Sequence, residues 1–217
     1  MEFYHVLNRG VEKRDVFLDD HDRVRFLHDL FVFNDQQSVL HSRQPGRTGQ
    51  SQARRMLVRI HAFCLMPNHY HLLLSPLVEN GIPLFMKKLS MGYTKYFNER
   101  YGRSGALWQG KYKKILIEHE AHFLYIPYYI HLNPLDLAFP EWRTGQVKDS
   151  KVALEYLRNF RWSSHLDYSG TRNFPSLTDR VSILPMLGSR RDYEREIANI
   201  ISAPEIAEKS LDFEFSS

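Results

Sequence analysis

Two histidines separated by a single residue form the most informative pair of side chains in this sequence. His69 and His71 stand in the segment NHYHLLL, whose apolar run predicts a strand. Side chains at positions i and i+2 of a strand project from the same face, so we expect the two imidazoles side by side. There they could share one metal ion, although two polar side chains on a half-exposed strand face would give the same pattern.

A second candidate group lies on a predicted helix near residue 130. Tyr125, Tyr129 and Asn133 are spaced by four residues, so a helix places them one above another. Asn133 precedes a proline, and we therefore expect it at the very end of the helix, where its side chain can reach a metal ion. Pro127 either kinks this helix or marks its true start. Taken without the His pair, a row of tyrosines would indicate ordinary core packing.

The composition narrows the class of protein. The chain has 217 residues, of which 43% are hydrophobic and 25% are charged, as in a soluble globular domain with an extension. The single cysteine, Cys64, excludes a disulfide framework and Cys-rich zinc modules, and leaves a zinc site of Cys64, His69 and His71 as one alternative. No apolar run is long enough for a membrane helix and the first residues lack a signal-peptide pattern, so we expect a cytoplasmic protein with no membrane partner.

The positive charge of the chain is concentrated in one stretch. The formal net charge is +4, but the segment from Lys87 to Lys114 holds eight basic residues and one acidic residue, Glu99. Six aromatic residues are interleaved with these charges. Cations beside rings that can stack on bases favour single-stranded nucleic acid as a partner, whereas a solvated basic face over core aromatics is the alternative.

The predicted elements follow a recognisable order. They are a strand at 3–7, a helix from Asp19 or Asp20, strands at 57–65 and 69–75, a helix from Pro83, a strand at 111–118 and a helix at 122–132. This βαββαβ order predicts a ferredoxin-like α+β sandwich with one additional helix, which bears the tyrosines. In the strand at 57–65, the even positions Val58, Ile60, Ala62 and Cys64 predict one continuous apolar face.

We divide the chain at residue 140. Residues 1–140 form the predicted domain, interrupted at about 34–56 by a polar segment that indicates a long mobile loop. Residues 141–217 form a partly helical C-terminal extension with predicted helices at 152–157 and 192–201 and an acidic tail from Glu205 to Glu214.

Four segments together resemble a known family. YHVLNRG, LMPNHYHLLL, GALWQGKYK and YIHLNP, in this order, are similar to the single-tyrosine transposases of the HUH (His-hydrophobic-His) endonuclease superfamily, and most closely to the REP-associated tyrosine transposases. The resemblance covers about Tyr4 to Asn133, and the later segment NFRWSSHLDYSG also resembles that subgroup. Residues 1–140 are thereby identified as an HUH single-tyrosine transposase domain.

The resemblance implies a reaction and assigns residues to it. His69 and His71 match the HUH metal ligands, Tyr129 matches the nucleophile, and Asn133 stands where the family places a third ligand. Such enzymes cut single-stranded DNA beside a hairpin, with a divalent metal ion, Mg²⁺ or Mn²⁺, and leave a 5′-phosphotyrosine and a free 3′-hydroxyl. DNA transposition by a monomer or a homodimer is the implied activity.

The residues also suggest contacts to DNA and leave other functions open. Our candidates for DNA binding are Arg9, Trp108, Lys111, Lys113 and Lys114, with the indole stacking on a base and the cations pairing with phosphates. One alternative is a domesticated hairpin-DNA-binding protein that no longer transposes. Another is an RNA-binding ferredoxin-like module, which would explain the basic aromatic stretch but not the His pair.

Overall fold

A four-stranded antiparallel sheet forms the centre of the protein. The computed structural model describes residues 1–37 and 54–202. The strands are β1 (Tyr4–Arg9), β2 (Val58–Met66), β3 (His69–Pro76) and β4 (Lys113–Leu116). Their order in the sheet is β2-β3-β1-β4, and each neighbouring pair is antiparallel. This is the arrangement of a ferredoxin-like α+β sandwich, as the sequence predicts.

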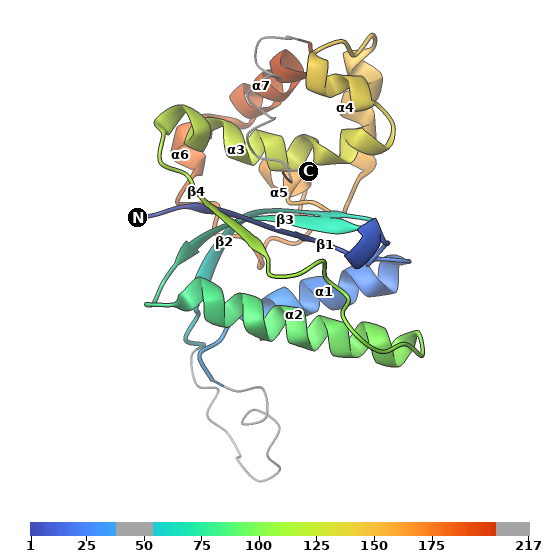
Figure 1. Ribbon diagram of the computed structural model, residues 1–217. Helices are drawn as coiled ribbons and strands as arrows, with labels where there is room; N and C mark the ends of the chain where they lie inside the picture. Colours follow the sequence, from blue (N-terminus) through green and yellow to red (C-terminus); the bar gives the residue numbers. More distant parts are fainter. Residues whose placement is uncertain (38–53, 203–217) are drawn as a thin grey trace.

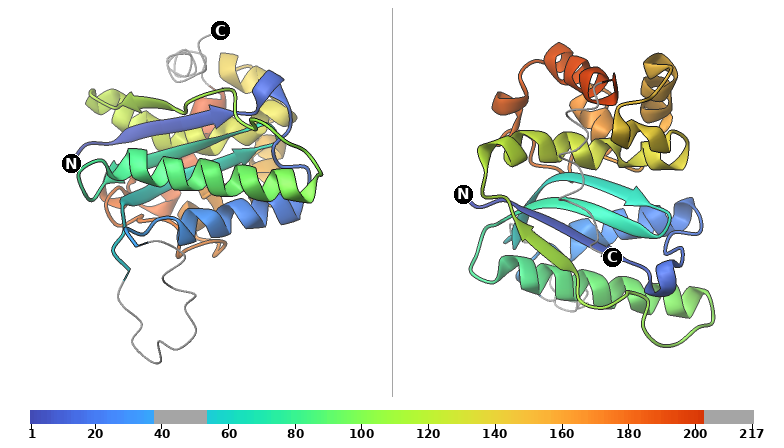
Figure 2. Two further views of the ribbon diagram at one scale, coloured as in Figure 1. Left: turned by 60° about the horizontal axis from the view of Figure 1, so that its bottom comes forward. Right: turned by 45° about the horizontal axis from the view of Figure 1, so that its top comes forward.

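Helices cover both faces of the sheet (Figure 1). One layer consists of α1 (Asp20–Val32) and α2 (Gly81–Arg100). The other contains α3 (Glu120–Leu132), the 3-10 helices η3 (Asn133–Leu137) and η4 (Pro140–Thr144), and the C-terminal helices α4 (Ser150–Asn159), α5 (His165–Tyr168), α6 (Leu184–Leu187) and α7 (Arg190–Ser202). Figure 2 shows the helices α4 and α7 of the extension over α3, on the side of the sheet away from α1 and α2.

Each face of the sheet has its own apolar core, because side chains alternate along a strand. On β3, Tyr70, Leu72 and Leu74 pack with α1 and α2. Leu73 belongs to the other core, which includes residues of α3, α4 and α7. The predicted alternation of this strand is therefore confirmed.

A bulge in β2 overturns the predicted apolar face of that strand. The pairing with β3 shifts register between Ile60 and Ala62. Val58 and Ile60 consequently pack with the α1 and α2 core, whereas Ala62 and Cys64 pack with the α3 core. The extra residue of a bulge reverses the side-chain alternation beyond it, so the even positions do not share one face.

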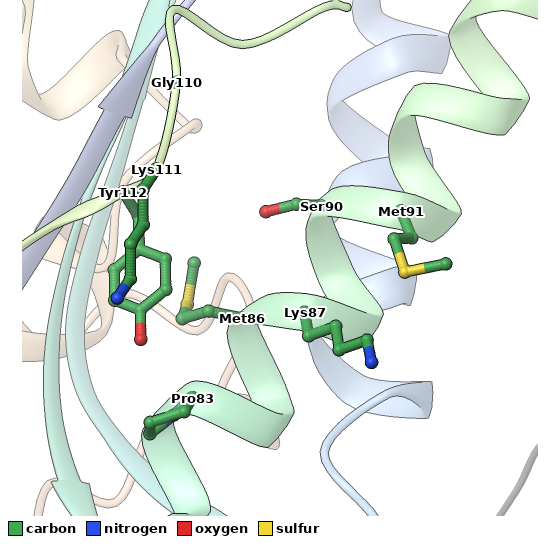
Figure 3. Close-up of a pocket in the computed structure, with 8 residues that line it drawn as sticks. All are labelled: Pro83, Met86, Lys87, Ser90, Met91, Gly110, Lys111 and Tyr112. Atoms are coloured by element: carbon green, nitrogen blue, oxygen red, sulfur yellow. The ribbon is translucent and has the colours of Figure 1, made fainter.

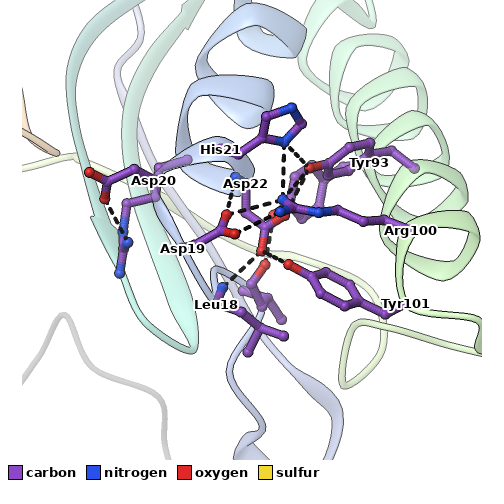
Figure 4. Close-up of polar contacts among 11 residues, drawn as sticks. Leu18, Asp19, Asp20, His21, Asp22, Tyr93, Arg100 and Tyr101 are labelled. Carbon is purple, nitrogen blue, oxygen red and sulfur yellow. Dashed lines mark hydrogen bonds and ion pairs between the residues drawn. The ribbon is translucent and has the colours of Figure 1, made fainter.

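A buried carboxylate joins α1 to α2 (Figure 4). Asp22 is fully buried and accepts hydrogen bonds from the Arg100 guanidinium at 2.6 Å and from the hydroxyls of Tyr96 and Tyr101 at 2.8 Å each. Arg100 also pairs with Asp19, the residue that caps the N-terminus of α1. Arg100, one of the basic residues of the 87–114 stretch, is therefore paired with carboxylates of the fold.

The tyrosine-bearing helix is longer than the sequence predicts. It begins at Glu120, and Pro127 lies inside it, so Pro127 does not mark the start of the helix. Asn133 is its C-terminal cap residue, as expected from the proline that follows. The helix therefore presents Tyr125 and Tyr129 one turn apart.

Two of the sequence predictions concern residues that the structure does not describe. Most of the polar segment at 34–56 and the acidic tail at 205–214 belong to residues 38–53 and 203–217, which the structure does not describe. The expected C-terminal helices at 152–157 and 192–201 lie within α4 and α7. Within the described ranges, no helix combines the length and apolar character needed to cross a membrane.

Candidate active site

The strand register places three histidines on the face of the sheet that α3 covers. In the antiparallel pair of β1 and β3, Leu7 lies opposite His71 and Arg9 lies opposite His69. Directly opposite residues share a face, and His5 is two positions before Leu7, so its side chain is on that face too. The rings of His69 and His71 have centroids 4.9 Å apart, which confirms that they stand side by side.

His5 and His71 are joined by a buried hydrogen bond. The distance between His5 Nε2 and His71 Nδ1 is 2.9 Å, and the two rings are almost parallel, with an interplanar angle of 12°. His5 is fully buried and His71 is 2% exposed, whereas His69 is only partly buried. His69 therefore lies at the open side of the group.

The three imidazoles are uncharged at neutral pH. Burial lowers the pKa of His5 and of His69 to about 3, and the cations Lys113, near His5, and Arg9, near His69, act in the same direction. Burial also holds the pKa of His71 well below its ordinary value. A neutral imidazole keeps a lone pair on one ring nitrogen, which is the form that binds a metal ion.

Helix α3 brings Tyr129 against this group. The Tyr129 ring meets His71 and His5 edge-on, with centroid distances of 5.7 and 5.8 Å. Tyr128 points elsewhere and stacks on Tyr193 of α7 at 5.4 Å. Tyr125 is one turn earlier, and its ring is 6.4 Å from that of Tyr129. The structure thus brings Tyr129 to the His pair, as the sequence reasoning expects.

Asn133 is buried at the end of α3 and its amide is already oriented. Its Nδ2 donates to the backbone carbonyl of Tyr129 at 2.7 Å, which is the expected one-turn relation. The Oδ1 atom is 3.4 Å from a guanidinium nitrogen of Arg143, so this contact is weak. A Mg²⁺ or Mn²⁺ ion would bind the amide oxygen, Oδ1. The hydrogen bond to the helix uses Nδ2, so it does not occupy Oδ1.

Arg143 and His5 belong to this site although the sequence analysis did not select them for it. Arg143 comes from η4, is fixed by two hydrogen bonds to Asp136, and has its guanidinium carbon 5.5 Å from the centre of the Tyr129 ring. It is close enough to lower the pKa values of His69 and His71. No pattern near residue 143 in the sequence links it to residue 69. His5, by contrast, lies in the segment YHVLNRG, which carries part of the family resemblance, two positions before Leu7.

The Nε2 atom of His71 is buried without a hydrogen-bond partner among the described residues, so it could serve as a ligand atom for a cation. Cys64 lies opposite His71 on β2, and burial raises the pKa of its thiol well above the ordinary value. Among the described residues, no three His, Cys, Asp or Glu side chains are grouped to hold a metal ion, so the zinc alternative with Cys64 is not supported.

The residues expected to contact DNA do not form one surface. Arg9 and Lys113 lie on the face of the histidines, because their pairing partners are His69 and Leu7. Lys114 is on the opposite face, where its ammonium group lies 4.5 Å from the centre of the Tyr4 ring. These three cations therefore reach both faces of the sheet, and only two of them adjoin the site.

The expected role of Trp108 is wrong. Its side chain is 7% exposed and packs in the core between the sheet and the helices α1 and α2. Rings of Phe26, Tyr70 and Tyr93 surround it, with centroid distances of 6.3, 5.3 and 6.0 Å. An indole enclosed in this way has no open face on which a base could stack.

Lys111 lies at an open pocket away from the histidines (Figure 3). The pocket has a volume of about 300 Å³ and separates α2 from the segment that leads into β4. Met86 and Tyr112 supply apolar walls, Lys87 is the second cation, and Ser90 points toward Tyr112. Lys111 is therefore on the α2 side of the molecule.

Comparisons with known proteins agree with the geometry. A family model described as IS200-like transposase matches residues 27–133. No curated protein matches the sequence. A solved structure of a REP-associated tyrosine transposase bound to a REP hairpin is similar, with a TM-score of 0.48 and 13% identity over 80% of this chain and 82% of that chain. A likeness of that size transfers no ligand. Residues 27–133, slightly less than half of the chain, are therefore similar to the IS200-like transposases, and this segment includes His69, His71, Tyr129 and Asn133.

Proposed function

We propose that this protein is a metal-dependent endonuclease and strand transferase that acts on single-stranded DNA at a hairpin. The observation that carries the proposal is the contact of the Tyr129 ring with His71, together with the bond from Asn133 to the Tyr129 carbonyl. Tyr129 supplies a nucleophile beside the imidazole pair, Asn133 supplies an amide one helical turn later, and the matched family model is one of transposases. That set is what a phosphoryl transfer through a tyrosine requires.

The proposed reaction exchanges one phosphodiester bond for another. The Tyr129 oxygen forms a bond to phosphorus, and the bond from phosphorus to the 3′ oxygen breaks. The phenol proton passes to solvent, and the departing 3′ oxygen takes up a proton. The product is a 5′-phosphotyrosine, which conserves the bond energy so that a 3′-hydroxyl can later attack it without ATP.

A divalent cation fits the proposed site. His69, His71 Nε2 and Asn133 Oδ1 would hold it, and the unpaired Nε2 atom favours this assignment. A bound Mg²⁺ or Mn²⁺ polarises a phosphate and stabilises the leaving oxygen, which a phenol with a pKa of about 10 needs. Within the described ranges no acidic cluster joins these ligands, so we expect weak binding until phosphate oxygens of the DNA complete the set.

The burial of the site determines how DNA must approach. Tyr129 is 1% exposed and His71 is 2% exposed, while His69 is partly open and lies opposite Arg9. A phosphate therefore enters over His69, where Arg9, whose Nε donates to Gln109, contributes positive charge. Side chains that cover Tyr129 must move aside for in-line attack, because the reacting atoms have to approach to about 3–3.5 Å.

A labelled hairpin oligonucleotide with a single-stranded flank tests the proposal. We expect a covalent protein–DNA adduct in the presence of Mn²⁺, and a loss of adduct but not of DNA binding in His69→Ala. Binding of the hairpin with no adduct under any divalent metal would instead identify a domesticated DNA-binding protein. Equal adduct formation in EDTA would contradict the metal dependence.

A further inference from the structure

His5 lies in the site but outside both the expected ligand set and the segment matched by the family model, which begins at residue 27. We propose that His5 is a positioning residue: it accepts a hydrogen bond from His71 Nδ1 and thereby leaves His71 Nε2 able to bind the divalent cation. This inference rests on the proposed function, which supplies the cation.

The contact between the two rings is well defined. His5 Nε2 and His71 Nδ1 are 2.9 Å apart, and the ring centroids are 5.1 Å apart. His5 is fully buried, and Tyr129 packs edge-on against it. A ring enclosed in this way cannot swing away from His71 without disturbing the nucleophile, so the hydrogen bond fixes the orientation of both imidazoles.

The position of the hydrogen atom between the two rings decides whether His71 Nε2 can bind a metal ion. Two neutral imidazoles in contact place one hydrogen between their nitrogens. If His5 Nε2 carries it, His71 is protonated at Nε2 and has no lone pair there for a metal ion. If His71 Nδ1 carries it, the lone pair lies at Nε2 of His71. That atom is buried without a hydrogen-bond partner, an unfavourable state that a bound cation would relieve.

The chemical nature of the proposed acceptor, the His5 ring, affects how tightly His71 binds the cation. Metal-binding histidines usually donate their second N–H to a carboxylate, a backbone carbonyl or water, and removal of that partner weakens metal binding by about 10- to 100-fold. Here the acceptor is an uncharged imidazole. It orients His71 without adding negative charge, which agrees with a cation that binds firmly only when DNA phosphate is present.

Binding of Mn²⁺ alone, followed by loss of the free-ion EPR signal, measures the role of His5 without any DNA reaction. His5→Leu removes the acceptor, and we expect the Mn²⁺ Kd to rise by about 10- to 100-fold. His5→Gln places an amide oxygen near the position of Nε2 and should restore most of the affinity. His61→Leu is the matched control, since His61 is a buried strand histidine whose nitrogens bond to Asp179 and Ser75.

The outcomes separate the positioning role from the proposed function. If the unmodified protein binds Mn²⁺ and His71→Ala does not, the metal site stands; a His5→Leu Kd equal to that of the unmodified protein then overturns the role of His5 alone. If His61→Leu weakens binding as much as His5→Leu, the effect is general destabilisation and the inference is wrong. If the unmodified protein binds no Mn²⁺, both proposals fail.

Discussion

The hydroxyl of Tyr193 joins the C-terminal extension to the helix that bears the proposed nucleophile. It is 2.8 Å from Nδ1 of His131 and 2.8 Å from Nδ1 of His165, and all three side chains are buried. The other nitrogen of His131 is 2.7 Å from the Ser164 hydroxyl. His131 follows Tyr129 by two positions on α3, so this network fixes the end of the helix on which the proposed reaction depends.

Tyr193→Phe removes one hydroxyl and leaves two buried imidazole nitrogens without a partner. Each buried polar atom left unsatisfied costs about 1–3 kcal/mol, so the free energy of unfolding should fall by roughly 2–5 kcal/mol. For a chain of this size, that loss lowers the Tm by roughly 5–15 °C. We do not expect a water molecule to replace the lost hydroxyl fully, because the phenyl ring still fills the space of the tyrosine ring.

Urea unfolding and thermal melting of the variant measure this loss. Tyr128→Phe is the matched control: Tyr128 stacks on Tyr193, but its hydroxyl makes no hydrogen bond with a described residue. We expect the control to lie within about 0.5 kcal/mol of the unmodified protein. If the two variants lose the same stability, the Tyr193 hydroxyl does not hold the helices together and the reasoning is refuted.

Three further predictions follow from the placement of charges. Asp22→Asn should destabilise the fold by about 1.5–3 kcal/mol in urea unfolding, because the buried carboxylate that accepts from Arg100, Tyr96 and Tyr101 is lost; a loss below about 0.5 kcal/mol would contradict its role in joining α1 to α2. Lys113→Gln should lower the salt slope of single-stranded DNA binding by about 1, and Lys114→Gln, on the opposite face, should not; equal slopes would show that both faces bind. Burial lowers the pKa of His165 to about 4, so its contribution to stability is complete above the unfolded pKa of about 6.5 and is lost as the pH falls toward 4; at pH 5 this amounts to about 2 kcal/mol, and a Tm unchanged between pH 7.5 and 5 would contradict it.

The sequence predicts the order of strands and helices along the chain and the face of the His pair, since both depend on local periodicity. The alternation of β3 alone separates His69 and His71 from Tyr70. The bulge at Ile60 has no such signal, because the apolar residues of β2 are continuous and both of its faces are buried. Periodicity therefore could not reveal the reversal.

The remaining errors concern contacts between segments far apart in the chain. Trp108 stands among lysines, but the aromatic rings that enclose it come from α1, β3 and α2. Arg143 reaches Tyr129 only because η3 and η4 turn the chain back over the helix end. A local composition of cations and aromatics cannot tell a buried ring from an exposed one.

Mapping the tyrosine that becomes attached to DNA tests the central proposal most directly. After reaction with the hairpin oligonucleotide and Mn²⁺, nuclease trimming, proteolysis and mass spectrometry should locate the nucleotide on Tyr129. Tyr129→Phe should abolish the adduct while hairpin binding stays within about twofold, because it removes one hydroxyl and no charge. Tyr125→Phe should still form it. A nucleotide found on Tyr125, or an adduct that persists in Tyr129→Phe, would contradict the assignment of the nucleophile and, with it, that of Asn133 as a ligand.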